Sequence, residues 1–220
     1  AEATLVRPAG LCVRLDGELV AIDAGAERIY RFADPDNLAP LAGTRYPTGY
    51  TAGDGGSALE AQFAAPLRVA CAADGEIFFT HASRVRAIDA EGRIRTVISS
   101  LGSPTGIAVD SLGRIYYSEA SAHKVSRYDP ADKSSTVIAG SGTAGFSGDG
   151  GSAAEALLNA PGDLALDAAG NLYIADGNNR RVRRVTASGT IDTVAGSFRG
   201  FIYSDYSGEL ATEIGFGKIE

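Results

Sequence analysis

Short apolar segments separated by polar turns recur along this chain, most regularly in residues 159–196. Four short segments of strand length, rich in Val, Ile and Tyr, occur in this stretch, with Gly, Asn, Asp and Ser between them; the third carries only Val182 and Val185 as apolar residues. They lie at 164–166, 172–175, 182–185 and 191–194. Because β-branched and aromatic residues favour strands and the intervening residues favour tight turns, the stretch predicts a four-stranded antiparallel meander, the size of one propeller blade.

The same unit occurs four times, and a proline and a glycine mark each copy. The two markers are nine positions apart every time. The pairs are Pro8 and Gly17, Pro66 and Gly75, Pro104 and Gly113, and Pro161 and Gly170. Four copies in register predict an all-β propeller, a single domain over residues 1–220. The predicted blades lie at about 8–43, 66–98, 104–140 and 161–196, with Gly-rich connectors at 44–65, 141–160 and 197–220.

Four strings of residues carry a resemblance to a known family. They are SGTAGFSGDGG at 141–151, LNAP at 158–161, GNLYIAD at 170–176 and VAG at 194–196. These strings closely resemble NHL-repeat β-propellers of the bacterial, extracellular type. The resemblance implies the fold and a secreted protein, extracellular or periplasmic, but says little about activity, because the fold serves scaffolds, receptors and enzymes. NHL propellers commonly have six blades, so the four here form either a small ring or part of a larger one.

The first strand of each copy alternates large and small side chains. Positions three and five after the proline are mostly large and position four is small, which predicts that the large face of one sheet packs on the small face of the next. Cys12 is at position four of its strand and Cys71 at position five of its own. Because side chains alternate along a strand, we expect the two thiols on opposite faces of their sheets, unpaired and buried as small hydrophobes.

Two insertions, at 46–62 and 142–157, share the sequence Gly-Asp-Gly-Gly followed by Ser-x-x-Glu. The second part is a capping-box pattern, so one or two helical turns capped by Ser57 and Ser152 are expected. In the first part, Asp54 and Asp149 are candidate calcium ligands, since Gly and Asp concentrate in loops that wrap this cation. The alternative is that the glycines only serve tight turns, because each loop offers a single carboxylate.

Charge and hydropathy argue against two classes of partner. The net charge is −7 and the pI is near 4.9, so no nucleic-acid surface is expected, because such surfaces neutralise phosphates with Lys and Arg. No apolar stretch approaches the roughly 18 residues that cross a bilayer. The dense basic run at 180–184 is interpreted as part of a repeated ion pair between neighbouring blades, with the acidic residues that recur at the ends of second strands, such as Asp23, Glu119 and Asp176.

The entrances to the first strands are the best candidates for ligand contact. Two residues after the proline, two copies have glycine, whereas the others have Arg68 and Asp163. Charged residues at a propeller rim favour contact with a ligand. His81, which replaces the acidic residue at the end of its second strand, is a third candidate. The other histidine, His123, lies in a different copy, so this chain cannot supply a three-histidine zinc site, and we predict no catalytic residue.

These observations favour a non-catalytic binding or scaffolding propeller that recognises a protein or a small ligand through its rim loops. The alternative, which the resemblance implies, is an enzyme of the same fold, an amidating-type lyase or a lactonase-like hydrolase with a metal on the propeller axis. Inner strands rich in Gly, Ala and Leu favour the first hypothesis. An open array of blades would leave apolar sheet faces bare, so we also expect self-association or a larger parent chain.

Overall fold

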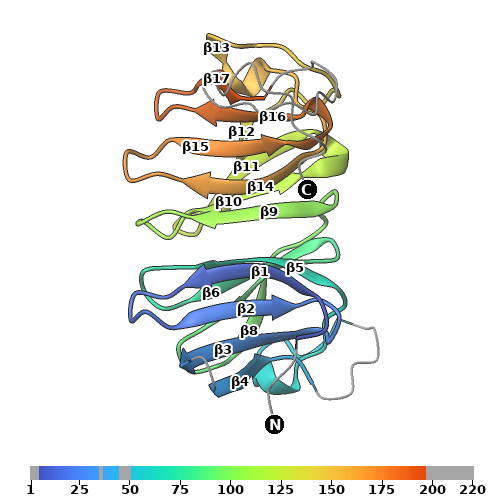
Figure 1. The fold of residues 1–220 in the computed structure, drawn as a ribbon, viewed down its shortest axis with the longest axis vertical. Helices are drawn as coiled ribbons and strands as arrows, with labels where there is room; N and C mark the ends of the chain where they lie inside the picture. Colours follow the sequence, from blue (N-terminus) through green and yellow to red (C-terminus); the bar gives the residue numbers. More distant parts are fainter. Residues whose placement is uncertain (1–4, 35–36, 45–50, 197–220) are drawn as a thin grey trace, which may run out of the picture. The chain divides into compact units, whose positions relative to one another are not determined.

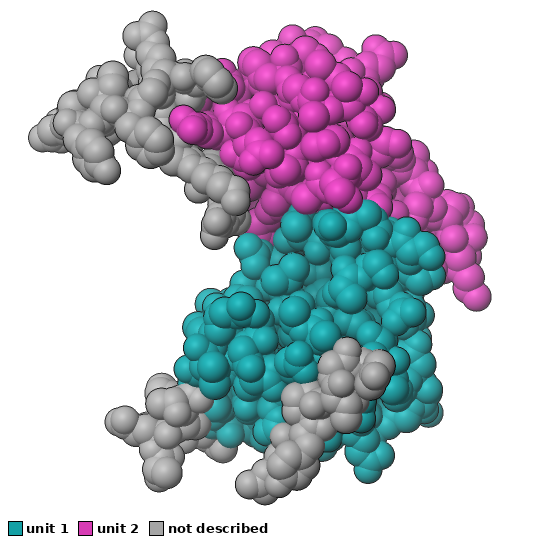
Figure 2. Space-filling model, turned by 90° about the vertical axis from the view of Figure 1, so that its right-hand side faces the viewer, with its two compact units in different colours: residues 1–113 teal, residues 114–220 magenta. Residues whose placement is uncertain are grey.

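The computed structural model describes residues 5–34, 37–44 and 51–196. The chain is all-β, with a few short 3-10 turns. It divides into two compact units, residues 1–113 and 114–220, which Figure 2 colours separately. The predicted connector at 197–220 lies outside the described residues.

The first unit contains two four-stranded sheets and one further strand (Figure 1). Consecutive strands are antiparallel neighbours in both sheets, as the repeat predicts. The first sheet comprises β1 (Pro8–Val13), β2 (Leu19–Asp23), β3 (Arg28–Asp34) and β4 (Asn37–Ala42). The second comprises β5 (Pro66–Cys71), β6 (Ile77–His81), β7 (Arg84–Ile88) and β8 (Ile94–Ile98). Strand β9 (Pro104–Val109) lies beside β5.

The second unit holds the remaining strands of the third and fourth repeats. The third repeat contributes β10 (Ile115–Glu119), β11 (Lys124–Asp129) and β12 (Ser134–Ala139). The fourth contributes β14 (Pro161–Leu166), β15 (Leu172–Asp176), β16 (Arg181–Val185) and β17 (Thr190–Ala195), and the short strand β13 (Gly151–Ser152) pairs with β17 as a fifth strand. The prediction of four strands in each repeat is confirmed.

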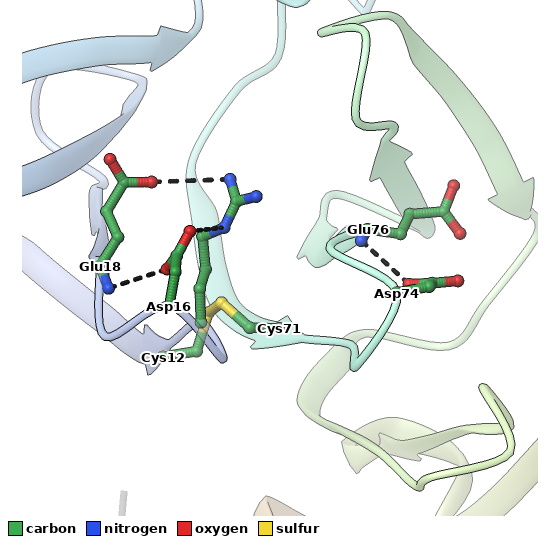
Figure 3. The surroundings of a disulfide bond; sticks show 7 residues. Cys12, Asp16, Glu18, Cys71, Asp74 and Glu76 are labelled. Atoms are coloured by element: carbon green, nitrogen blue, oxygen red, sulfur yellow. Dashed lines mark hydrogen bonds and ion pairs between the residues drawn. A yellow bond between two sulfur atoms is a disulfide. The ribbon is translucent and has the colours of Figure 1, made fainter.

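A local side-chain interaction explains where the first strand of each repeat ends. The turn after it carries an Asp whose carboxylate accepts a hydrogen bond from the backbone N–H two residues further on. Asp16 accepts from Glu18 at 3.0 Å and Asp74 accepts from Glu76 at 3.0 Å (Figure 3). Asp110 and Asp167 do the same in the other repeats. This Asx geometry closes a tight turn without help from the rest of the fold, so the turns are readable from sequence.

The core of the first unit consists of apolar side chains that pack between its two sheets. Val20, Ile22 and Ile29 of the first sheet pack with Val69 and Phe79 of the second, and all five are buried. Val69 is at position three of its first strand, so the large face of the second sheet meets the first sheet, as the alternation predicts. Burial of apolar area between sheets is the main source of stability in such an arrangement.

The backbones of neighbouring first strands approach very closely in this core. A Cβ atom added to Gly10 would lie 3.0 Å from the carbonyl oxygen of Leu67 and 3.1 Å from Cα of Arg68. A side chain at position 10 would need the two strands to move apart by a few tenths of an ångström. The close packing of the sheets therefore favours glycine at this position.

The prediction that Cys12 and Cys71 are unpaired is wrong. The two residues form a disulfide, with their Cα atoms 5.7 Å apart, between strands β1 and β5 (Figure 3). The alternation of side chains is as expected: the two thiols do point from opposite faces of their sheets. The error lay in the conclusion, because opposite faces of two stacked sheets face one another across the gap between them. The disulfide ties the first two repeats together at that gap.

We expect reduction of the disulfide, or the change Cys12→Ser, to lower the free energy of unfolding by about 2 to 4 kcal/mol, because the bond closes a long loop in the unfolded chain. Urea denaturation with and without reductant measures the loss. Cys12→Ser and Cys71→Ser should cost similar amounts, and reductant should not weaken either variant further. Alkylation of both thiols in the folded, unreduced protein would contradict the pairing.

Candidate functional site

The two Gly-Asp-Gly-Gly insertions cover the outer edges of the sheets that follow them. Ser57 forms a bridge with Arg93 just before β8, and β13 pairs with β17 through Gly151 and Ile191. Each insertion also holds the preceding sheet, because the N–H of Gly43 bonds to Ala58 O, and the corresponding N–H of Gly140 bonds to Ala153 O, both at 2.9 Å. The insertions thus connect the outer strands of successive repeats within each unit.

Each insertion contains the expected helical turn, but the capping prediction is wrong. The turns are single 3-10 turns, η1 (Ala58–Glu60) and η3 (Ala153–Glu155). Neither Ser57 nor Ser152 makes a side-chain cap hydrogen bond. A turn of three residues closes with backbone bonds, such as Glu60 N–H to Ser57 O, so it has little need of a side-chain cap.

The two candidate calcium ligands each pair with an arginine. Asp54 forms an ion pair with Arg86 of β7, and Asp149 forms one with Arg183 of β16 at 2.7 Å. Both arginine side chains are completely buried. Among the residues that the structure describes, no group of three His, Cys, Asp or Glu side chains could hold a metal ion.

Backbone carbonyl oxygens accept further hydrogen bonds from both buried arginines. Arg86 donates to Gln62 O at 3.2 Å and to Ala52 O at 3.3 Å, while Arg183 donates to Ser147 O at 3.0 Å and to Leu157 O at 3.5 Å. These carbonyls all belong to the insertions. A guanidinium group has five N–H donors in a planar fork, so one side chain can hold several segments of a loop at once.

Sequence reasoning missed the role of these arginines, although a signal was present. Arg86 and Arg183 occupy the same register position, opposite Phe79 and Ile174 of their second strands. Both repeats that follow an insertion have arginine there, whereas the other two have Tyr30 and Ser126. Arginine occurs at this position only in the two repeats that follow an insertion, and this pattern would have predicted that the arginine contacts the insertion.

The acidic residue at the end of the second strand anchors the chain before the marker proline. Asp23 accepts backbone N–H bonds from Val6 at 2.7 Å and Arg7 at 2.9 Å. Burial raises the pKa of Asp23, but these and two further backbone bonds outweigh it and hold the pKa below its usual value. Asp176 similarly accepts from Asn159 N–H at 2.8 Å. The predicted ion pair between neighbouring blades is wrong for both residues: Asp176 lies 3.4 Å from Arg183 of its own sheet, and Asp23 is bonded to backbone N–H groups.

In the second repeat, His81 replaces this acidic residue and lies in an apolar, cationic environment. The residue is completely buried, and its ring centroid lies 6.1 Å from that of Phe63 and 6.0 Å from that of Phe79. Burial, and then the charge of Arg86, lower the pKa of His81 to about 4. The side chain is therefore a neutral part of the core at physiological pH, between the sheets rather than at an accessible rim.

Arg68 and Asp163 lie in different units, each at the start of a first strand. Arg68 donates from Nη1 to Ala9 O at 2.9 Å, so its guanidinium reaches across to the neighbouring strand β1. Asp163 is exposed, and its carboxylate accepts a hydrogen bond from Leu164 N–H at 3.0 Å. Ligand contact by either residue stays a prediction.

A separate surface feature is an apolar patch on β1 and the turn after it. It consists of Leu11, Val13 and Leu15, and we call it the β1 patch. These side chains are 63%, 63% and 83% exposed. The corresponding first position in the second sheet, Val69, is only 6% exposed, because the first sheet packs over it. The β1 patch is thus a sheet face of the kind that is covered elsewhere in the same molecule.

We expect Arg183→Met to lower the free energy of unfolding by about 3 to 5 kcal/mol, because Asp176 would remain buried without its cationic partner. Asp149→Asn should cost about 1 kcal/mol or less, since that carboxylate is partly exposed. Arg181→Met, a change of a half-buried arginine on the same strand, is the matched control for urea denaturation. A loss for Arg183→Met no larger than that of the control would contradict the anchoring role.

A second prediction concerns His81 and pH. Because the folded-state pKa of His81 is near 4, below the usual 6.5, the unfolded chain binds the proton more readily. This contribution to stability is complete above pH 6.5 and is lost as pH falls toward 4, by up to about 3 kcal/mol. His81→Leu should lack this part of the acid sensitivity, whereas His123→Asn should retain it. Parallel curves of unfolding free energy against pH for wild type and His81→Leu would refute this assignment.

Comparisons with known proteins agree with the architecture. The chain matches the Teneurin NHL domain family over residues 46–103 and 132–205, more than half of its length. Teneurin-3 of Danio rerio is 30% identical over an alignment of 149 residues, and the match covers 60% of this chain and 6% of that protein. The chain therefore spans a small part of the teneurins that it matches.

Two solved structures share the fold at low sequence identity. An auxiliary nutrient binding protein from Bacteroides ovatus has a TM-score of 0.66 at 17% identity, covering 89% of this chain and 49% of its own. Virginiamycin B lyase from Staphylococcus aureus has a TM-score of 0.60 at 18% identity, covering 86% of this chain and 56% of its own. These likenesses concern the fold alone. The family match and the four strands in each repeat together establish that the chain belongs to the Teneurin NHL domain family of NHL-repeat propellers.

Proposed function

We propose that this chain is a binding module whose β1 patch docks against a β-sheet of a partner. The exposure of Leu11, Val13 and Leu15 is the observation that carries the proposal. Soluble proteins rarely leave adjoining large apolar side chains bare, and such patches are typical of interaction sites.

The chemistry of the partner surface follows from the packing inside the chain. The second sheet presents Val69 and Cys71 at the positions that Leu11 and Val13 hold in β1, and the surface that covers them contains Gly10 and Cys12. A sheet whose inner strand carries small side chains at matching positions would cover the β1 patch in the same way. In a solution of this chain alone, such a sheet comes from a second copy; in a longer polypeptide, it would come from another repeat.

The disulfide supports a location outside the cytoplasm. Structural disulfides persist in oxidising compartments and are rare where thiols are kept reduced. The bond between Cys12 and Cys71 therefore favours an extracellular or periplasmic protein. None of the short helical turns that the structure describes has the length or apolar character to cross a membrane.

Contacts through the rim remain part of the proposal. Arg68 and Asp163 stand at the entrances of first strands, where charged side chains would fix the orientation of a ligand. The enzyme alternative gains no support from the likeness to a lyase, because that likeness extends to the fold and carries no catalytic residue to this chain.

Light scattering of the 220-residue chain tests the β1 patch. We expect the mean mass to rise with protein concentration, and the double change Leu11→Ser with Val13→Ser to raise the dissociation constant about tenfold or more, because it removes most of the apolar contact. Leu112→Ser is the matched control, since that leucine is 71% exposed in a turn outside the patch. A chain that stays monomeric at all concentrations, with or without the double change, would contradict the proposal.

A further inference from the structure

Two clefts occupy equivalent places in the two units. In the first unit, a cleft of about 290 Å³ lies between the outer strands of the first repeat and the β7–β8 turn at Asp89 to Gly92. In the second unit, a cleft of about 430 Å³ lies between β11, β12 and the β16–β17 turn at Thr186 to Gly189. Each has a β-strand arginine in its wall, so we call them the Arg31 cleft and the Arg127 cleft. Both clefts are large enough to bind a small molecule, and because they lie at equivalent places their residues can be compared directly.

The Arg31 cleft has its positive charge compensated. Arg31 lies 3.8 Å from the carboxylate of Glu18, and Arg14 in the same wall lies 3.5 Å from Glu18. The turn that closes the cleft adds Asp89 and Glu91 to its lining. An anionic ligand would meet carboxylates on both sides of this cleft.

The Arg127 cleft differs in the residue that should pair with its arginine. Glu18 follows the marker glycine of the first repeat, and the third repeat has Arg114 at that place. Arg127 pairs in register with Tyr116, two residues beyond Arg114 on the same face of the strand. The carboxylate of Asp132 interacts electrostatically with Arg127, but its hydrogen bond is with another group, the N–H of Ser134, at 2.9 Å. Nε of Arg127 is buried and has no hydrogen-bond partner, as is also true of Nε of Arg14 in the Arg31 cleft, so the difference between the clefts lies in the carboxylates.

The rest of the Arg127 cleft is rich in hydroxyl groups. They belong to Tyr116, Ser152, Thr186, Ser188 and Thr190, and no Asp or Glu is among the described residues that line this cleft. The hydroxyls of Thr186 and Ser188 lie 2.9 Å apart, and Thr186 Oγ1 also accepts from Thr190 N–H at 3.1 Å. These bonds hold the turn in shape and occupy the Thr186 hydroxyl, while the Ser188 hydroxyl keeps further bonding capacity. Leu172 and Val185 form an apolar wall.

We propose that the Arg127 cleft binds an acidic sugar, that is, a hydroxylated ring that bears one carboxylate. The guanidinium group of Arg127 matches a carboxylate in geometry and charge. The hydroxyl groups match the alternating donors and acceptors of a sugar, and the volume admits one or two sugar rings. The site shares no residue with the β1 patch and does not depend on that proposal.

Isothermal titration of the 220-residue chain with sodium glucuronate and sodium galacturonate tests the site. We expect at least one of the two to bind. Glucose should bind about tenfold more weakly or not at all because it lacks the carboxylate, and so should acetate because it lacks the hydroxylated ring. Arg127→Gln should weaken binding about tenfold or more. Arg114→Glu should do the same by restoring the arginine and glutamate pair of the first repeat.

Arg31→Gln is the matched control, because it changes the equivalent arginine in the other unit. It should leave the affinity within about twofold of wild type, as expected for a distant, independent site. Circular dichroism confirms that each variant is folded, and Arg127→Lys, which keeps the charge, should bind with intermediate affinity. Absence of binding by both acidic sugars, equal affinity for acetate, or equal losses in Arg31→Gln and Arg127→Gln would overturn the proposal.

Discussion

The apolar character of both faces of each sheet is the constraint on which the rest of this structure depends. A sheet that is apolar on both sides is stable in water only if another sheet covers each side. In the first unit this requirement brings β1 and β5 so close that a Cβ atom at position 10 would lie 3.0 Å from a backbone carbonyl oxygen of β5. The same closeness allows Cys12 and Cys71 to bond across the gap. One face is uncovered, at the β1 patch, and this is the face that we propose docks against a partner.

The outer edges of the sheets present a different problem, which the insertions solve. An outer strand has unpaired backbone groups that could pair with another chain. The insertions bond to these edges beside β8 and at β17, and the buried side chains of Arg86 and Arg183 hold them in place. Burial of a charged group is costly unless it is paired and hydrogen-bonded. The carboxylates and loop carbonyls bond to the two terminal nitrogens of each guanidinium group, while Nε of each is buried without a hydrogen-bond partner. The candidate calcium ligands Asp54 and Asp149 thus each have a positively charged partner from the same chain.

Repetition gives this protein its two candidate binding surfaces because equivalent positions can diverge once the packing is satisfied. The Arg31 and Arg127 clefts are formed by equivalent strands and turns of the repeat, but their residues differ. Glu18, Asp89 and Glu91 compensate the positive charge of the first cleft, whereas the second has Arg114 in place of Glu18 and no acidic residue among the described residues of its lining. Asp176 and His81 likewise lie at equivalent positions of two repeats. Asp176 forms a buried ion pair with Arg183, whereas burial lowers the pKa of His81 and makes the core of its repeat sensitive to acid. Function in such a scaffold resides in these departures from the repeat, and the fold itself is common to all copies.

The amino-acid sequence alone determined the strand positions, the turns and the family, because these depend on local alternation and on side chains such as Asp16 and Asp167 that close their own turns. It also predicted the large and small faces of the first strands. Only the tertiary structure decided what lies opposite each face. The pairing of Cys12 with Cys71, the anchoring of the insertions by Arg86 and Arg183, and the burial of His81 all join residues from different strands or repeats. Periodicity assigns a side chain to a face of its own sheet, but the distance to a partner is set by how two sheets stack, and that depends on the volumes of every side chain between them.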